Sequence, residues 1–180
     1  MSNSAQTRAA ELAQGFSLRE LGRGIGRLEM DAEDVCIMGV CDDSRLACPG
    51  YALMCLPRSG KHASEFAAVA EEKGATAIIA VGVTVDSELP ILHLKDMQQA
   101  GQLLRRMFRT EGAGPHVYGI TGTDGKTSVA WMLREALSRY QERPVWSSGT
   151  LGWMRSVDDI RDIGNTTPSM LTTRAMLASA

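Results

Sequence analysis

The stretch GITGTDGKTSVAWMLREAL, residues 119–137, joins a glycine-rich turn to an apolar pattern with helical spacing. From Val129 onward, apolar residues recur at the i, i+3, i+4, i+7 and i+8 positions, which predicts a helix with one apolar face packed on a sheet. The apolar segment HVYGIT at 116–121 precedes the turn and is a predicted strand. A strand, a glycine turn and a helix in this order predict an α/β unit.

The glycine turn resembles a phosphate-binding loop but departs from the common spacing. That spacing is G-x-x-x-x-G-K-[ST], and the position five residues before Gly125 is Ile120. Glycines stand instead at Gly119 and Gly122. The physical requirements are still met, because glycines let backbone N–H groups turn onto phosphate oxygens and the helix directs its positive N-terminus there.

The residues after the turn favour phosphate over a plain packing turn. Lys126 supplies a cation for the β- and γ-phosphates of a nucleotide, and the hydroxyl of Thr127 is a ligand suited to Mg²⁺. The alternative is an ordinary glycine-rich connection from strand to helix. Such a connection has no need of a lysine followed by two hydroxyl residues, so we predict a nucleotide phosphate site.

Bulk composition is that of an ordinary soluble globular protein. Of 180 residues, 44% are hydrophobic, and the net charge of -2 gives no electrostatic case for nucleic acid or an anionic membrane. No apolar run approaches the ~20 residues of a membrane helix, and the N-terminus lacks a signal-peptide core. We therefore expect a cytoplasmic protein that binds neither nucleic acid nor membranes.

Four cysteines lie within one short window, but their spacing does not favour a zinc site or a disulfide. They include no C-x-x-C pair, and no histidine lies among them; they are Cys36, Cys41, Cys48 and Cys55. We expect reduced thiols in and around strands.

The first 110 residues read as a small α/β domain. Predicted strands lie at 35–40, 51–56, 76–82 and 90–94, and predicted helices at 17–22, 64–74 and 96–109. Ser17 and Glu20 are spaced as a capping box, Ser64 is a predicted N-cap, and Gly74 is a predicted helix stop. A polar loop before the second strand is closed by the turn pair Pro49–Gly50.

A second domain is predicted to begin after the linker at 109–115, so the domains are 1–110 and 111–180. Besides the strand and helix around the glycine turn, it has a predicted strand at 144–150. A last helix is predicted with Thr167 as N-cap and Pro168 at the first helical position. Two strands are too few for a complete nucleotide-binding domain.

These motifs resemble the Mur ligase family. GITGTDGKTS is similar to the family's ATP loop, G-x-T-G-T-N-G-K-T-[TS], which has the same displaced glycines, with Asp124 where the family has asparagine. Residues 41–80 look like the N-terminal domain that the MurE and MurF types share. GTLG at 149–152 and NTTP at 165–168 resemble the MurE type, and the resemblance covers nearly all of 17–180.

The resemblance implies a fold and an activity. The fold would be α/β: a MurE/MurF-type N-terminal UDP-substrate domain followed by the start of a P-loop central domain. MurE-type enzymes are ATP-dependent amide ligases of cytoplasmic peptidoglycan synthesis. They add meso-diaminopimelate or L-lysine to UDP-MurNAc-L-Ala-D-Glu, whose D-Glu carboxylate becomes an acyl phosphate that the incoming amine attacks. Which of the two amino acids is added does not follow from the residues present.

Site residues follow from the matched motifs. The cofactors ATP and Mg²⁺ would be held by Gly122, Thr123, Asp124, Gly125, Lys126, Thr127 and Ser128, with Lys126 and Thr127 as catalytic residues and Thr127 near the metal. The UDP-substrate would be held by Ser44, Ser59, Gly60, Lys61, Asn165, Thr166 and Thr167. Without the resemblance, DDSR reads equally as a solvated turn in which Asp43 caps its own backbone, and NTTP as a plain helix cap.

Other readings of the chain stay open. The family's central-domain acidic Mg²⁺ ligand, its carbamylated lysine and its C-terminal domain have no counterpart in the 180 residues, so we expect no complete ligation by this polypeptide alone. It is the N-terminal part of a longer ligase, a stand-alone UDP-sugar-binding module, or a relative acting on a carboxylate outside the cell wall. An incomplete second domain would expose apolar faces, which a homodimer would cover.

Overall fold

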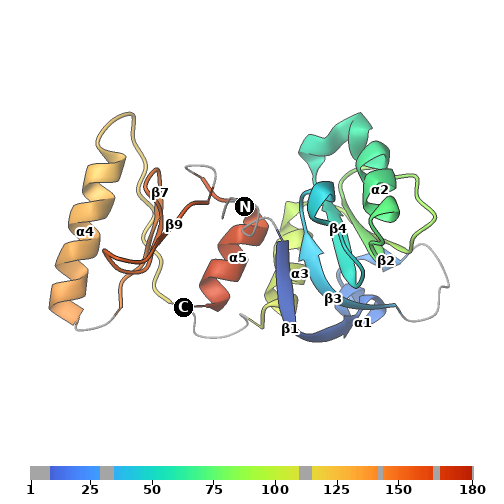
Figure 1. Cartoon of the computed structure of the whole chain (residues 1–180), viewed down its shortest axis with the longest axis horizontal. Helices are drawn as coiled ribbons and strands as arrows, with labels where there is room; N and C mark the ends of the chain where they lie inside the picture. Colours follow the sequence, from blue (N-terminus) through green and yellow to red (C-terminus); the bar gives the residue numbers. More distant parts are fainter. Residues whose placement is uncertain (1–8, 29–34, 110–114, 142–143, 164–166, 180) are drawn as a thin grey trace. The chain divides into compact units, whose positions relative to one another are not determined.

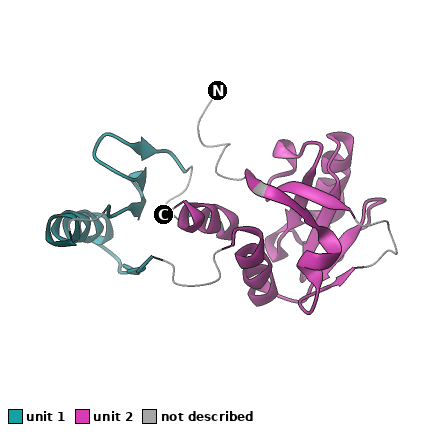
Figure 2. Ribbon diagram, turned by 90° about the horizontal axis from the view of Figure 1, so that it is seen from below, with its two compact units in different colours: residues 1–7, 115–169 teal, residues 8–114, 170–180 magenta. Residues whose placement is uncertain are grey.

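The computed structural model describes residues 9–28, 35–109, 115–141, 144–163 and 167–179, which form two compact units (Figure 1). One unit comprises 8–114 with 170–180, and the other comprises 115–169 together with 1–7 (Figure 2).

The larger unit is built on a six-stranded sheet with the order β1-β3-β4-β5-β6-β2. Its four central strands are parallel: β3 (Cys36–Cys41), β4 (Tyr51–Cys55), β5 (Ala77–Val81) and β6 (Ile91–Leu94). The edge strands β1 (Ala9–Ser17) and β2 (Arg27–Leu28) are antiparallel to their neighbours. All four predicted strands of this domain are confirmed, whereas β1 and β2 were not predicted.

Helices cover both faces of this sheet, which is why its central strands read as continuous apolar runs. All five residues of β5 are buried, and successive side chains enter opposite cores. Ile79 packs in the core that contains α1 (Leu18–Gly22) and α3 (Met97–Met107), while Ile78 packs against α2 (Ala63–Glu72). Figure 1 shows α2 and α3 on opposite sides of the strands.

Helix ends agree with the predicted signals in part. The Ser17 side chain accepts a hydrogen bond from the Glu20 amide at 3.1 Å, which confirms the predicted cap of α1. Gly74 has a φ of 83° just after α2, as its role as a stop requires. The predicted N-cap Ser64 is wrong: α2 begins at Ala63, and the Ser64 hydroxyl instead accepts from the Asp86 amide at 2.9 Å.

The last helix, α5 (Met170–Ala178), completes the core on the α1/α3 side. Leu171 is 1% exposed within that core, and Met170 packs against it. The predicted start at Thr167 and Pro168 is two residues too early, since the helix begins at Met170. By its contacts α5 therefore groups with the larger unit, although it follows the smaller one in sequence.

The smaller unit contains α4 (Lys126–Gln141) and an antiparallel sheet of β7 (Ser147–Gly149), β8 (Gly152–Met154) and β9 (Ile160–Arg161). Helix α4 and strand β7 agree with the helix predicted after the glycine turn and the strand predicted at 144–150. The predicted strand at 116–121 is wrong: these residues are in no strand, because no neighbouring strand in the described chain pairs with them.

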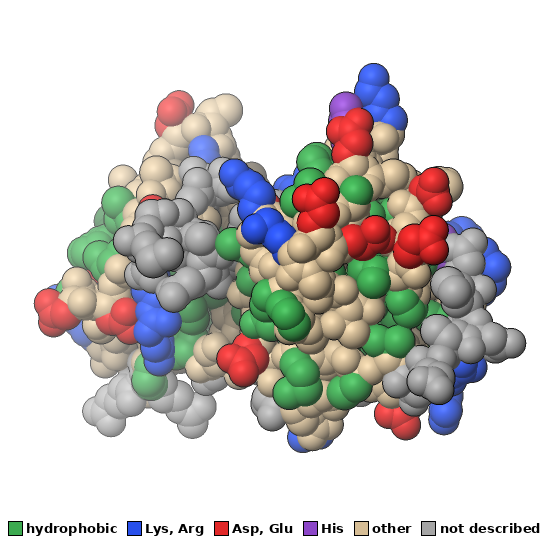
Figure 3. Space-filling view, turned by 45° about the vertical axis from the view of Figure 1, so that its right-hand side comes forward, with side chains coloured by type: hydrophobic (Ala, Val, Ile, Leu, Met, Phe, Trp, Pro, Cys, Tyr) green, Lys and Arg blue, Asp and Glu red, His purple; other side chains and the backbone are tan. Residues whose placement is uncertain are grey.

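The apolar side of α4 is not packed on a sheet as predicted. Val129 is 46% exposed and Met132 is 61% exposed, while the buried residue of α4 is Arg134. Figure 3 shows hydrophobic side chains among charged ones on one face of the chain. The smaller unit thus leaves uncovered an apolar surface of the kind that normally marks an interaction site.

Candidate functional site

The glycine turn of the smaller unit ends where α4 begins. Gly125 has a φ of 75°, a left-handed conformation that residues with a side chain adopt only at a cost, and Gly122 also has a positive φ of 152°. A Cβ placed on Gly125 would meet no atom within 4 Å. Gly125 is therefore required for its backbone conformation, and the space beside it is open to a ligand.

Backbone donors at the start of α4 face this open turn. The Val129 amide donates to the Gly125 carbonyl at 2.9 Å, which closes the first turn of the helix. The amides of residues 126–128 precede that bond and have no acceptor within the helix. All residues from 121 to 129 are exposed, so these donors and the positive helix end are accessible to an anion.

Two side chains of the loop have defined partners. The Lys126 ammonium donates to the carbonyl oxygens of Gly122 at 2.7 Å and Thr123 at 2.9 Å, so it lies across its own loop. The Thr127 hydroxyl lies 3.4 Å from the Thr150 hydroxyl in the turn between β7 and β8. This contact brings the GKT segment and the GTLG segment together. Asp124 and Ser128 are exposed beside them.

In the larger unit, the predicted substrate residues gather where parallel strands end. Ser44 follows β3 and begins the short 3₁₀-helix η2 (Ser44–Leu46), where it is 8% exposed. Ser59, Gly60 and Lys61 follow β4 within the 3₁₀ segment η3 (Pro57–His62). Because carboxyl ends of parallel strands share one edge of a sheet, both segments lie at the edge where open α/β sheets bind ligands.

Gly60 gives the second segment its shape. Its φ of 48° and ψ of -131° break the 3₁₀ geometry, and a Cβ there would meet no atom within 4 Å. Lys61 is exposed and Ser59 is half-buried next to this kink. At this kink the backbone turn and the Lys61 ammonium are therefore both accessible to solvent.

The DDSR turn has the local structure of a self-capped turn. The Asp43 carboxylate accepts a hydrogen bond from the Arg45 amide at 3.1 Å and two from the Arg45 guanidinium, at 3.0 and 2.7 Å. The hydrogen bond to Asp43 and its charge raise the pKa of Arg45. This shows that Asp43 caps the turn, and it leaves the proposed substrate role of Ser44 untested.

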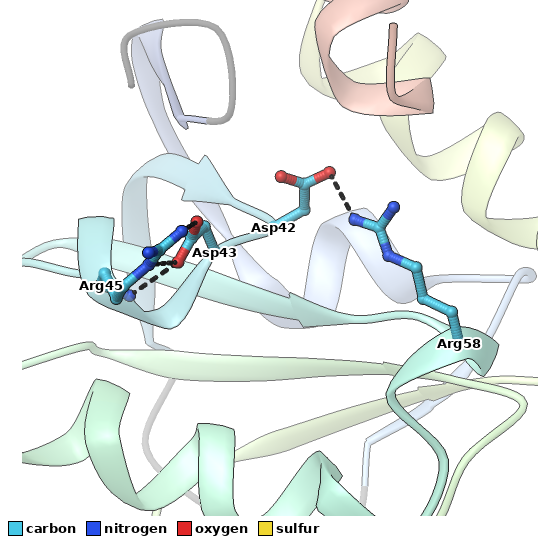
Figure 4. Close-up of polar contacts among 4 residues, drawn as sticks. All are labelled: Asp42, Asp43, Arg45 and Arg58. Atoms are coloured by element: carbon cyan, nitrogen blue, oxygen red, sulfur yellow. Dashed lines mark hydrogen bonds and ion pairs between the residues drawn. The ribbon is translucent and has the colours of Figure 1, made fainter. Parts of the chain in front are cut away.

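A pair at this edge was not predicted from sequence: Asp42 and Arg58 (Figure 4). The Asp42 side chain is fully buried directly after β3, and its Oδ2 lies 3.6 Å from Nη2 of Arg58, whose side chain is 61% exposed. In Figure 4 Asp42 and Asp43 point apart, with Arg45 on Asp43 and Arg58 reaching toward Asp42. The sequence signal was the doubled aspartate, which reads as a plain polar loop.

The third predicted segment is only partly described. Asn165 and Thr166 lie outside the described residues, and Thr167 is exposed ahead of α5. Their predicted role in substrate binding stays a prediction.

Cysteine and metal chemistry add little to either site. Burial raises the pKa of Cys41 to about 12 and that of Cys55 to about 11, so both are protonated thiols near neutral pH. Cys36 is exposed and Cys48 is half-buried, and all four are free. Among the residues that the structure describes, no group of three or more His, Cys, Asp or Glu side chains is arranged to hold a metal ion.

In the described parts of the chain, each helix is too short or too polar to cross a membrane.

Comparison with known proteins gives consistent matches. Residues 120–180 match the family model of the Mur ligase middle domain. The UDP-N-acetylmuramoyl-L-alanyl-D-glutamate–2,6-diaminopimelate ligase of Listeria monocytogenes is 33% identical over 144 residues, 78% of this chain and 28% of that protein. The ligase of the same name from Streptomyces avermitilis is 31% identical over 162 residues, 86% of this chain and 30% of that protein.

Solved structures show the same fold. A UDP-N-acetylmuramoyl-L-alanyl-D-glutamate–2,6-diaminopimelate ligase matches with a TM-score of 0.67 at 21% identity, over 92% of this chain and 33% of that one. MurF from Acinetobacter baumannii matches with a TM-score of 0.58 at 24% identity, over 95% of this chain and 34% of that one. The chain thus spans about 30% of the length of the curated relatives it matches.

Proposed function

Because this chain belongs to the Mur ligase family, with MurE-type ligases among its relatives, we propose that it carries the ATP loop and UDP-substrate surface of a MurE-type amide ligase. The observation that supports this most directly is the glycine turn. Its left-handed Gly125 opens onto the free amides at the start of α4, and Lys126 lies across the loop.

In the proposed reaction, the D-Glu carboxylate of UDP-MurNAc-L-Ala-D-Glu takes the γ-phosphoryl group of ATP. The amine of a third amino acid then displaces phosphate to form an amide. The relatives named above are 2,6-diaminopimelate ligases, which favours that amino acid over L-lysine. Of these events, the residues present here serve the first, by holding phosphate charge in place.

The residues of the loop fit a nucleotide triphosphate. The amides of residues 126–128 would donate to phosphate oxygens, and the Lys126 ammonium would exchange its loop carbonyl partners for the β- and γ-phosphates. A bound Mg²⁺ would neutralise charge on these phosphates, and the Thr127 hydroxyl would be its ligand from this loop. Gly122, Thr123, Asp124 and Ser128 complete the proposed loop.

The substrate surface is assigned to the larger unit. Ser44, Ser59, Gly60 and Lys61 lie at the carboxyl ends of β3 and β4, where small polar groups and a cation suit a uridine diphosphate. Asn165, Thr166 and Thr167 complete the assignment by the NTTP motif alone. The larger unit is thus the proposed UDP-substrate domain, and the smaller one the start of the ATP domain.

Calorimetry tests this proposal with UDP-MurNAc-L-Ala-D-Glu and Mg-ATP as separate titrants. We expect the polypeptide to bind both, with Lys126→Met weakening the binding of ATP and not of the UDP-substrate. Absence of UDP-substrate binding would favour a relative acting on another carboxylate. Binding of the UDP-substrate without ATP would favour the stand-alone UDP-sugar module.

An amide-forming assay with both ligands and either diamino acid tests the remaining part. Since the polypeptide spans about 30% of its relatives, we expect no ligation product from it alone. Steady turnover would show that the 180 residues suffice for catalysis.

We further propose a cytoplasmic location, where both substrates are made, and pairing of two copies through α4. The exposed face of α4 has the apolar side chains of Trp131 and Met132, which pairing with a second copy of the helix would cover. Sedimentation of wild type and Met132→Glu tests this: a dimer that the substitution dissociates supports the pairing, and a monomeric wild type contradicts it.

A further inference from the structure

We propose that Arg58 binds the diphosphate of the UDP-substrate and that the buried carboxylate of Asp42 is the positioning residue that holds it there. This inference rests on the proposed function of the larger unit. It adds two residues to which the matched motifs assign no role.

Asp42 is a buried carboxylate within the sheet. Its side chain has no exposed area and lies at the end of β3, which stands between β1 and β4. A buried carboxylate is costly unless positive charge compensates it. The guanidinium of Arg58 lies 3.6 Å from its Oδ2, so Asp42 attracts that side chain back over the carboxyl edge of the sheet.

The guanidinium of Arg58 keeps hydrogen-bond donors that Asp42 does not use. A separation of 3.6 Å is an ion pair but is too long for a hydrogen bond, so the N–H groups of the guanidinium are not consumed by Asp42. Its side chain is also 61% exposed. Arg45 at the same edge differs, because two of its N–H groups already bond the Asp43 carboxylate at 3.0 and 2.7 Å. Arg58 is therefore the arginine available to an anion.

The residues next to Arg58 in the chain also suit an anion. It lies in the same 3₁₀ segment as Gly60 and Lys61, so a second exposed cation and an open backbone kink stand beside it. Arginine binds phosphate oxygens in a planar, two-pronged arrangement that lysine cannot reproduce. A diphosphate would thus contact Arg58 through its fork and Lys61 as a point charge.

A purely structural role for the pair makes a different prediction. If Arg58 only compensated Asp42, its loss would change the stability of the edge and would weaken uridine and UDP alike. If it binds diphosphate, its loss weakens UDP and spares uridine. The ratio of the two affinities therefore separates the two roles.

NMR titrations of the full chain with UDP and with uridine measure that ratio, and thermal melting reports on the fold of each variant. We expect Arg58→Met to weaken UDP at least about tenfold with uridine unchanged, and Arg58→Lys to recover part of the loss. Asp42→Asn should weaken UDP about threefold, and adding it to Arg58→Met should cause no further loss, since Asp42 acts through Arg58. Arg105→Met, an exposed arginine at the end of α3, is the matched control and should bind both ligands like wild type.

The outcomes distinguish this inference from the proposed function. A wild type that binds neither ligand overturns both. A wild type that binds UDP while Arg58→Met binds it equally well, or loses UDP and uridine together, overturns only the role of Arg58. Additive losses in the double variant overturn the positioning role of Asp42.

Discussion

Replacement of Leu171 by alanine tests whether α5 is part of the core of the larger unit. Leu171 is 1% exposed, and the change removes three carbon groups at about 0.8 kcal/mol each, or about 2–3 kcal/mol in transfer free energy. A cavity would add to this in a rigid site. Because α5 is a single helix at the end of the chain, it can shift to fill the space, so we expect the free energy of unfolding to fall by about 2–3 kcal/mol.

Urea unfolding followed by two probes measures this loss. All three tryptophans, Trp131, Trp146 and Trp153, lie in the smaller unit, so their fluorescence reports that unit while far-ultraviolet circular dichroism reports the whole chain. Leu171→Ala should shift the dichroism transition to lower urea and leave the fluorescence transition in place. Leu177→Ala, at a half-buried position of the same helix, is the matched control and should have a smaller effect. Equal stability of Leu171→Ala and wild type, with unchanged amide exchange in α5, would refute the docking of this helix.

Three further predictions concern the loop, the thiols and the exposed helix. Gly125→Ala should cost about 1–2 kcal/mol and weaken ATP binding because of its φ of 75°. Gly101→Ala, in α3 at a position with open space, should lower neither stability nor ATP binding; equal losses in melting and calorimetry would contradict this. Burial raises the pKa values of Cys41 and Cys55 to about 12 and 11 from 9.0, so their contribution to stability is complete below pH 9 and is lost progressively as the pH rises from 9 through 11–12. Urea unfolding at pH 8 and 10.5 should show that loss, and a flat profile would exclude it. Hydrogen exchange should be faster in α4 than in β5, because the apolar face of α4 is exposed; uniform strong protection in a monomer would contradict this.

The fold class predicted from sequence is confirmed, and the central strands show why it was accessible. A strand buried on both faces must be apolar throughout, so β5 reads as AIIAV and is recognised without knowledge of its neighbours. β1 could not be found in this way. Its sequence AAELAQGFS is rich in residues that favour helices, and it becomes a strand because β3 offers an unpaired edge.

The wrong prediction of a strand at 116–121 also depends on the neighbouring strand. Here the segment favours a strand, but no described strand pairs with it. HVYGIT has the composition of a strand, but a strand needs a neighbour to satisfy its backbone groups. The described strands of the smaller unit pair among themselves as β7, β8 and β9, which leaves these residues exposed: Val117 is 73% and Tyr118 is 58% exposed. The local sequence pattern correctly indicates that the segment favours an extended conformation, but it contains no information about whether a neighbouring strand is present to pair with it.

The two candidate sites, one in each unit, differ in how much of them the sequence predicts, and the difference is one of distance along the chain. The phosphate loop is local: its glycines, its lysine and the helix that follows are consecutive, so their spacing alone carries the chemistry. Asp42 and Arg58 are separated by β4, and they meet because two parallel strands deliver their carboxyl ends to one edge of the sheet. A sequence pattern names neither the pair nor its geometry, since the buried position of Asp42 exists only once β3 lies within the sheet. Pairs of residues that meet only at such an edge are therefore the ones that a motif search misses and a structure supplies.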